Sequence, residues 1–240
     1  MIKLENVDVF GWEAAIRGCR NPYNSWDKSD SHFGRKNTDT YVEIGGEKYY
    51  CLSENIYGIG KNDLKLMKSL SKAGSDHAKF LRMINVTVDI TAPLYWWKEF
   101  DTYKVGTVAN STSTMHRLTH KPFEMSDFSC EHLTDGSINL LKNIIEELNK
   151  WRRLYNRYDT LSEDNRGFTN GDITCKKDIW WQMIQLLPSS YNQKRTVQLN
   201  YQVLKSMYFA RKNHKLDEWR EFCKWCESLP YFCDICINND

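Results

Sequence analysis

The sequence predicts an α+β fold, with a mixed β-sheet flanked by helices and a second half rich in helices. Alternating apolar residues at positions 84–90 are typical of a strand with one buried face. Apolar residues spaced by three and four over positions 141–158 predict a long amphipathic helix. Because the predicted strands lie mainly in the first half and the helices in the second, the order favours α+β over a parallel βαβ array.

Composition narrows the class of protein. The 240 residues suffice for one large domain with a sizeable core. Lys and Arg together number 33 and Asp and Glu 31, so net charge does not favour DNA or RNA as a partner. No apolar run approaches the roughly 20 residues of a membrane span, and no signal peptide is recognisable. The 8 cysteines, without an export signal, indicate reduced thiols in a cytoplasmic protein.

The N-terminal part is predicted to contain short strands and helices around a polar loop. Two β-rich runs flank Gly45-Gly46, and they predict a hairpin because glycine accepts the positive φ of tight turns. Asn62 is expected to cap a helix that stops at Gly74. The expected elements are a strand at residues 2–9, a helix at 12–20, a loop at 20–40, hairpin strands at 41–44 and 48–52, a helix at 62–72 and a short piece at 77–82.

Residues 83–117 are predicted to form a central strand, a short helix and a hydroxyl-rich loop. Ala92-Pro93 is expected to end the central strand, and Pro93 suits the first turn of a short aromatic helix at residues 94–101. A second β-like piece is expected at residues 103–105. Hydroxyl side chains follow, and such a loop can hold an anion through hydroxyls and backbone amides, although a solvated loop is the alternative. These hydroxyls are Thr107, Ser111, Thr112, Ser113 and Thr114.

The remaining chain is predicted to be mainly helical. Pro188 and the Lys212-Asn213-His214 corner are the expected breaks between the last helices. The expected elements are an irregular segment at residues 118–135, a helix at 137–158, a polar loop at 160–174, and helices at 176–187, 189–210 and 216–228.

Two CxxC motifs near the C-terminus allow two interpretations. Four thiolates from Cys223, Cys226, Cys233 and Cys236 could close a tetrahedral zinc site and form a small interaction module. The six residues between the motifs are few compared with the roughly 15–20 of a zinc ribbon. Cys223 and Cys226 also fall on the apolar stripe of a predicted helix, where a free thiol packs as a small apolar group. We therefore expect core packing and no metal site.

The order of parts resembles the flavin-dependent thymidylate synthases of the ThyX type. Residues 66–93 match a helix that ends in Gly, a turn with His77 and Phe80, and a strand that ends in Ala-Pro. Residues 199–211, LNYQVLKSMYFAR, resemble the region that holds a flavin-contacting Asn and a nucleotide-contacting Arg, here Asn200 and Arg211. The resemblance implies a single ThyX-like domain over residues 1–240, with additions at about 41–52 (hairpin) and 159–174 (loop).

The family signature is altered in this sequence. Where the family has Arg-His-Arg, the chain has Thr102-Tyr103-Lys104, and the preceding Arg-Gln pair becomes Lys98-Glu99. Lys replaces a bidentate guanidinium with a point charge. The last Arg of the family signature aligns with Met115, and Arg117 lies two positions after it. The remaining positions of the signature align with Thr107, Asn110, Ser111 and Ser113.

The resemblance implies a homotetramer that binds FAD and a pyrimidine nucleotide. The implied reaction is reductive methylation of dUMP to dTMP with methylenetetrahydrofolate and NADPH. The altered signature leaves a second hypothesis open, namely action on another pyrimidine nucleotide or service as a non-catalytic nucleotide- or flavin-binding subunit. Arg211 is the expected catalytic residue. Nucleotide contacts are expected from Lys98, Glu99, Ser111, Ser113, Arg117 and Arg211. Flavin contacts are expected from His77, Arg82, Thr102, Tyr103, Lys104, Thr107, Asn110 and Asn200.

Overall fold

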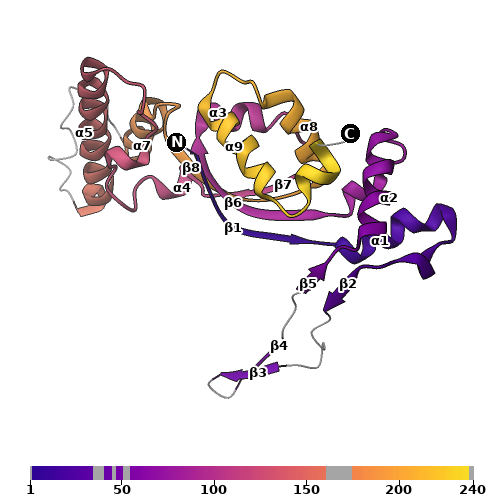
Figure 1. Cartoon of the computed structure of the whole chain (residues 1–240). Coiled ribbons are helices and arrows are strands. Elements are labelled where there is room, and N and C mark those ends of the chain that lie inside the picture. The colour runs from indigo at the N-terminus through magenta and orange to yellow at the C-terminus, as the bar shows by residue number, and fades with distance from the viewer. Residues whose placement is uncertain (1, 35–40, 45–46, 51–54, 161–174, 238–240) are drawn as a thin grey trace. The chain divides into compact units, whose positions relative to one another are not determined.

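The computed structural model describes residues 2–34, 41–44, 47–50, 55–160 and 175–237 (Figure 1). The chain forms two compact units. Unit 1 comprises Met1–Glu5, Asp89–Thr102 and Ala109–Thr196; unit 2 comprises Asn6–Val88, Tyr103–Val108 and Val197–Asp240. The predicted polar loop lies outside the described residues from position 161 to 174. No helix in the described part of the chain is long and apolar enough to cross a membrane.

A four-stranded antiparallel sheet has the order β1-β6-β8-β7. Its strands are β1 (Lys3–Phe10), β6 (Asn85–Pro93), β8 (Asn192–Asn200) and β7 (Val108–Ser111). Val86, Val88 and Ile90 of β6 are buried while the residues between them are half-buried, which confirms the alternation read from the sequence. The α+β class is confirmed as well, because the chain combines this antiparallel sheet with helices.

Two long helices of unit 1 pack around an apolar cluster. Leu141, Ile145 and Leu148 of one long helix contact Met183 of another, and Phe123 and Phe128 join them. Figure 1 shows these two helices, α5 and α7, side by side. The helices are α3 (Leu94–Phe100), α4 (Thr114–Arg117), α5 (Asp135–Arg157) and α7 (Lys176–Leu186), with 3-10 turns at Met125–Asp127 and Tyr158–Thr160.

Unit 2 has an aromatic core. Trp12 meets Tyr201 edge to face at 5.4 Å, and Phe232 meets the same tyrosine at 5.3 Å. Its α-helices are α1 (Trp12–Arg20), α2 (Lys61–Lys72), α8 (Tyr201–Arg211) and α9 (Asp217–Ser228). Its short helices lie at Asn21–Tyr23, Trp26–Lys28, Lys79–Arg82 and Cys233–Ile237.

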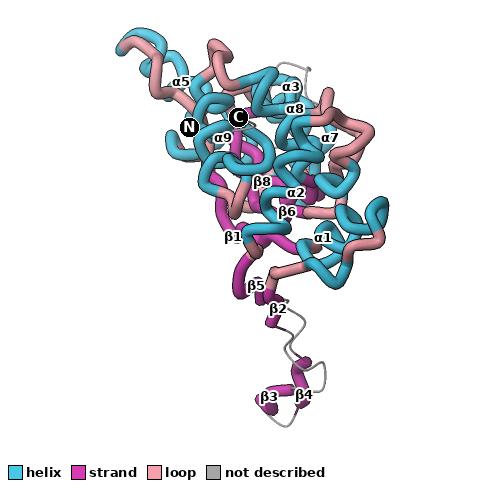
Figure 2. Tube along the Cα trace, turned by 45° about the vertical axis from the view of Figure 1, so that its right-hand side comes forward, coloured by secondary structure: helices cyan, strands magenta, loops and turns pink. Residues whose placement is uncertain are grey.

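Two strand pairs complete unit 2 (Figure 2). The predicted hairpin is confirmed, since β3 (Tyr41–Ile44) pairs antiparallel with β4 (Glu47–Tyr50) in the register Tyr41 to Tyr50. In a second antiparallel pair, β2 (His32–Gly34) pairs with β5 (Asn55–Gly58), and β2 lies within residues 20–40, where a loop was expected.

Two predictions about local structure are wrong. Residues 192–200 form β8 rather than the first half of a helix, and Pro188 precedes a turn and this strand. Gln193, Val197 and Leu199 are its buried positions, so pairing inside the sheet overrides the helix propensity of its Gln, Lys and Arg residues. The piece at residues 103–105 is a loop, and the strand is β7 at Val108–Ser111.

The start of α2 also differs from the prediction. Gly60 rather than Asn62 is the N-cap, and the capping acceptor is the carboxylate of Asp30, from a distant loop. Asp30 accepts from the backbone N–H of Asn62 at 2.9 Å and of Asp63 at 3.0 Å. A carboxylate at this end of a helix satisfies free donors and complements the helix dipole. Gly74, with φ +108°, follows the last turn as expected.

Candidate functional site

Arg211 is the last residue of α8, and a tight turn after it brings α9 back alongside. The backbone N–H of His214 donates to the carbonyl of Arg211 at 2.9 Å, and α9 begins at Asp217. The turn is held from the other side as well, because Arg220 donates to the carbonyl of His214 at 2.7 Å. Trp219, which is fully buried in the first turn of α9, therefore lies close to the Arg211 side chain.

The Arg211 guanidinium lies beside two aromatic rings that contact each other. Its Nε donates to the hydroxyl of Tyr103 at 3.0 Å, and its carbon lies 4.9 Å from the ring centroid of Trp219 and 5.6 Å from that of Tyr103. Cation–π contact of this kind holds the plane of a guanidinium. A guanidinium of fixed plane recognises phosphate or carbonyl oxygens with defined geometry. The structure thus brings together two of the predicted site residues, Arg211 and Tyr103.

The loop that carries Tyr103 lies against the start of α8. Gly106 has φ +77°, and a Cβ there would stand 3.1 Å from both Asn200 Nδ2 and Val203 Cγ2. Asn200 caps α8, since its side-chain oxygen accepts from the N–H of Val203 at 3.1 Å. Next to Gly106, the buried hydroxyl of Thr107 has no hydrogen-bond partner among the described residues.

The other residues of the predicted flavin set are spread over the chain. His77 and Arg82 of unit 2 are exposed, as is Lys104. Thr102 of unit 1 donates from its hydroxyl to the carbonyl of Glu99 at 2.7 Å and so closes the end of α3. Asn110 is exposed on β7.

Unit 1 contains a cavity of about 390 Å³ that is lined by polar side chains together with Leu118, Pro122 and Phe123. Four hydroxyl side chains face it together with an imidazole, two ammonium groups and one carboxylate. Such a lining suits an oxyanion such as phosphate, because hydroxyls and cations donate hydrogen bonds to it. These groups belong to Thr91, Thr112, Ser113, Thr114, His120, Lys121, Lys194 and Asp127, and Tyr191 and Asn192 complete the polar lining.

The hydroxyl-rich segment is fastened to β8 on one side of this cavity. Thr112 donates to the carbonyl of Lys194 from its N–H at 2.9 Å and from its hydroxyl at 3.1 Å. Gln193, which is buried, donates back to the carbonyl of Thr112 at 2.8 Å. Its side-chain oxygen accepts from Arg195, whose guanidinium stacks on the Trp97 ring at 4.1 Å. The cavity therefore has a rigid wall.

The charged groups of the cavity are paired with carboxylates. Lys194 contacts Asp89 at 2.9 Å, and this hydrogen bond raises the pKa of the ammonium. Lys121 contacts Asp127 at 2.6 Å, and its pKa is raised for the same reason. Burial raises the pKa of the Tyr191 phenol, and the charge of Asp127 adds to the effect. Both lysines are thus cations at neutral pH and Tyr191 is a neutral hydroxyl.

The predicted nucleotide set is only partly gathered at this cavity. Ser113 lines it, whereas Lys98 is exposed on α3 and Ser111 is exposed on β7. Glu99 is half-buried on α3, and Arg117 ends α4. Sequence reasoning missed Tyr191, Asn192 and Lys121 as cavity residues. The alternation of Val197 and Leu199 is the sign of a strand there, but it does not specify which segments lie beside that strand.

The C-terminal thiols lie in the packing of unit 2. Cys223, Cys226 and Cys236 are buried. Burial raises the pKa of Cys223 to about 11 and that of Cys236 to about 12, so these groups are neutral thiols at pH 7. In the described part of the chain, no group of three or more His, Cys, Asp or Glu side chains is placed to hold a metal ion.

Comparison with solved structures gives full-length matches. Thymidylate synthase X (ThyX) from Helicobacter pylori, crystallised with FAD and dUMP, matches with a TM-score of 0.61 and 15% identity over 100% of this chain and 99% of the other. A second structure of that enzyme with the same two ligands gives 0.60 and 16%, over 98% and 99%. The fold is ThyX-like. No protein-family model and no curated sequence matches the chain. The ThyX-like fold was expected from the resemblance of residues 66–93 and 199–211, and it is confirmed.

Proposed function

We propose that this protein is a flavin-dependent, thymidylate synthase-like enzyme that binds FAD and a pyrimidine nucleotide. The observation that carries the proposal is the fixed Arg211 guanidinium, at the position expected for the nucleotide-contacting Arg of a ThyX-like fold. ThyX of this fold binds FAD and dUMP in the two solved structures. The reaction proposed is reductive methylation of dUMP to dTMP, with methylenetetrahydrofolate and NADPH as co-substrates, in a homotetramer.

The loop that carries Tyr103 offers a flavin two groups, a buried hydroxyl and an exposed cation. Thr107 presents a buried hydroxyl without a hydrogen-bond partner among the described residues, and such a group is costly unless a ligand or water satisfies it. Lys104, exposed in the same loop, supplies a cation for a flavin phosphate. Thr107 and Lys104 are therefore the residues that would hold the cofactor. A bound reduced flavin would supply the hydride and the carbon-transfer chemistry.

The protein's own contribution is binding and orientation. Arg211 would donate to an oxygen of the nucleotide, and Tyr103 and Trp219 would keep its plane constant during binding. In unit 1, Ser113 and Lys194 offer a hydroxyl and a cation to an oxyanion in the 390 Å³ cavity. No protein nucleophile is required, which is consistent with a site built from Arg, Lys and hydroxyl side chains.

A second candidate function is favoured by two residues of the expected flavin set, Tyr103 and Asn200, whose side chains already have hydrogen-bond partners within the chain. The Tyr103 hydroxyl accepts from Arg211, and the Asn200 side-chain oxygen caps α8. Each would have to exchange a present contact for a flavin contact. This favours, as the second candidate, a non-catalytic nucleotide- or flavin-binding subunit, or an enzyme that acts on another pyrimidine nucleotide.

Product analysis separates the two candidates. Purified protein is incubated with FAD, NADPH, methylenetetrahydrofolate and dUMP, and dTMP is measured by mass spectrometry. The first candidate predicts dTMP formation that Arg211→Ala abolishes and that Lys65→Ala, an exposed change on α2, leaves intact. Nucleotide binding without dTMP supports the second. Light scattering of the same sample tests the homotetramer.

A further inference from the structure

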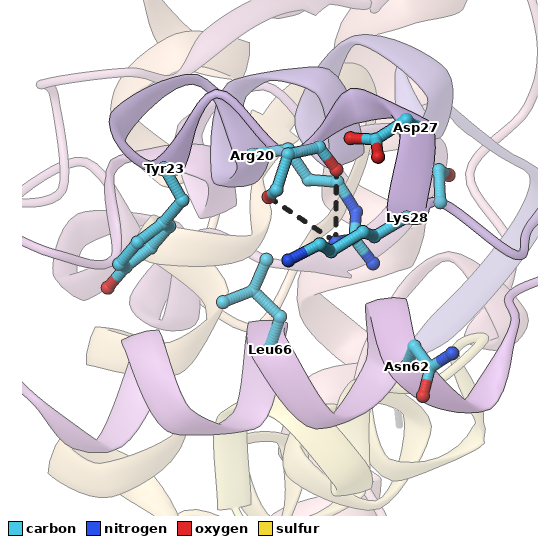
Figure 3. Close-up of a pocket in the computed structure, with 8 residues that line it drawn as sticks. Arg20, Tyr23, Asp27, Lys28, Asn62 and Leu66 are labelled. Atoms are coloured by element: carbon cyan, nitrogen blue, oxygen red, sulfur yellow. Dashed lines mark hydrogen bonds between the residues drawn. The ribbon is translucent and has the colours of Figure 1, made fainter.

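A second cavity lies in unit 2, and none of its lining residues belongs to the set expected to contact nucleotide or flavin. Its volume is about 870 Å³, within the range of small-molecule sites. The end of α1, the turns that follow it and the first half of α2 form its walls. In Figure 3, Lys28 extends toward Leu66 of α2 across the Arg20 side chain, and Tyr23 lies at the left of the view with its ring pointing down toward α2.

Arg20 is a buried cation with one donor group left over. Only 5% of the residue is exposed. Its Nε donates to Asp63 Oδ1 at 2.6 Å, and its Nη1 donates to the carbonyl of Ser25 at 3.2 Å. Its Nη2 has no partner among the described residues. A buried N–H group of a charged side chain destabilises the fold when it has no hydrogen-bond acceptor. An acceptor is therefore expected at Arg20 Nη2.

Asp63 does not provide that acceptor, although it is the ion-pair partner of Arg20. Its Oδ2 already accepts from the hydroxyls of Ser29 at 2.7 Å and Ser31 at 2.6 Å, and from the N–H groups of residues 30 and 31 at 3.2 Å. Its Oδ1 is taken by Arg20 Nε. These contacts hold the carboxylate in one orientation. The oxygen that would satisfy Nη2 must therefore come from outside this network.

Lys28 and Tyr23 also line the cavity, and they offer a cation and an aromatic ring to a ligand. Lys28 is exposed and makes no ion pair among the described residues, and in Figure 3 its chain passes across the Arg20 guanidinium. Tyr23 is 60% exposed, and it lines the same cavity as Leu66. Asp27 also lines the cavity, and its carboxylate would repel a bound anion. Movement of the flexible Lys28 chain would open Nη2 to a ligand.

We propose that this cavity binds a small molecule that joins an oxyanion, phosphate or carboxylate, to a planar group. The oxyanion accepts from Arg20 Nη2 and Lys28 Nζ, and the planar group packs on Tyr23 and Leu66. Guanidinium and ammonium groups together are the usual donors to such anions, and an exposed tyrosine ring is a stacking surface. The site is distinct from the one proposed for the nucleotide, because none of its residues belongs to the expected nucleotide or flavin set.

Calorimetric titration tests the site with phenyl phosphate, benzoate and, as the neutral control, phenol. Lys28→Met removes the charge and keeps the length of the side chain, and Lys65→Met is the matched exposed control on α2. We expect saturable binding of at least one anion, weakened about tenfold by Lys28→Met and unchanged by Lys65→Met. Asp27→Asn should strengthen binding, and Tyr23→Ala should weaken it. Preference for the ester or for benzoate identifies phosphate or carboxylate as the group recognised.

Other results would overturn the proposal. These are the absence of saturable binding of both anions, equal affinity of Lys28→Met and wild type, or phenol bound as well as the anions. The titration is repeated with Arg211→Ala, which damages the proposed nucleotide site. Unchanged anion binding there supports a separate cavity site even if no nucleotide ever binds, whereas its loss would assign the anion to Arg211.

Discussion

Arg211 and Tyr103 stand 108 positions apart in the sequence, and a hydrogen bond of 3.0 Å joins the guanidinium Nε of one to the hydroxyl of the other. Under the proposed function, this contact orients the arginine that binds the nucleotide. A tyrosine cannot donate two parallel hydrogen bonds to a phosphate, but it can hold the arginine that does. On this account the altered signature retains a role in orientation.

Tyr103→Phe tests this role. The change removes the hydroxyl and leaves the ring beside Arg211, so we expect a loss of about 1 kcal/mol in the free energy of unfolding and weaker dUMP binding. Denaturant titration and calorimetry measure the two effects. Tyr23→Phe, which removes an exposed hydroxyl, is the control. Unaltered dUMP affinity in Tyr103→Phe would show that the hydroxyl does not position Arg211.

Asn200 has a structural role that can be separated from a flavin role. Asn200→Ala removes the cap of α8 and should cost about 1 kcal/mol, whereas Asn200→Ser keeps a capping oxygen and should cost little. If Asn200 also contacts flavin, Asn200→Ser will retain stability and lose FAD affinity. Equal FAD affinity in Asn200→Ser and wild type would leave capping as the role of this residue.

Asp63 should make stability depend on pH in the acid range. Burial opposes its ionisation, but hydrogen bonds from Ser31, Ser29 and Arg20 outweigh that effect and hold the pKa of the carboxyl below its ordinary value of 3.8. A lowered folded-state pKa stabilises the fold fully above the unfolded-state pKa, and this contribution is lost as pH falls through the folded-state value.

The matching experiment compares wild type with Asp63→Asn. We expect a difference in the free energy of unfolding of about 3–5 kcal/mol near neutral pH, because Arg20 loses its buried partner. The difference should shrink as pH falls below 3.8. Asp76→Asn, an exposed change, should have little effect at any pH. A difference that stays constant into the acid range would contradict the assigned role of Asp63.

The thiols should react in two classes. Thiolate is the reactive form, and burial raises the pKa of Cys19 and of Cys236 to about 12. We expect these two and Cys226 to react with a disulfide reagent only after unfolding. Cys175 is exposed, so Cys175→Ser should remove one equivalent of the fast reaction in native protein, and Cys19→Ser should not. Fast modification of Cys226 in the native state would contradict its burial.

The sequence allowed prediction of elements whose pattern repeats with the period of the structure. Val86, Val88 and Ile90 alternate in β6, and residues 141–158 follow the helical period, so both were found. Residues 192–200 were assigned to a helix because Gln, Lys and Arg favour helices and only Val197 and Leu199 mark the buried side. Their strand state is set by neighbouring strands, which a local pattern does not show.

In the candidate site, too, contacts between distant segments could not be predicted from local sequence patterns. Arg211 and Asn200 were found through the order of motifs around them, but the contact with Tyr103 depends on the path of a distant loop. Lys121 and Tyr191 reach the unit 1 cavity only because the chain folds back there, and no spacing in the sequence encodes that meeting. The capping of α2 by Asp30 is likewise a long-range contact that the Asn62 prediction could not anticipate.

Titration of the purified protein with FAD, followed by dUMP, tests the central claim most directly. The account predicts visible flavin absorbance near stoichiometry, a spectral change when dUMP is added, and loss of that change in Arg211→Ala but not in Lys65→Ala. A colourless protein that takes up no added FAD, or a dUMP response identical in Arg211→Ala and wild type, would contradict it.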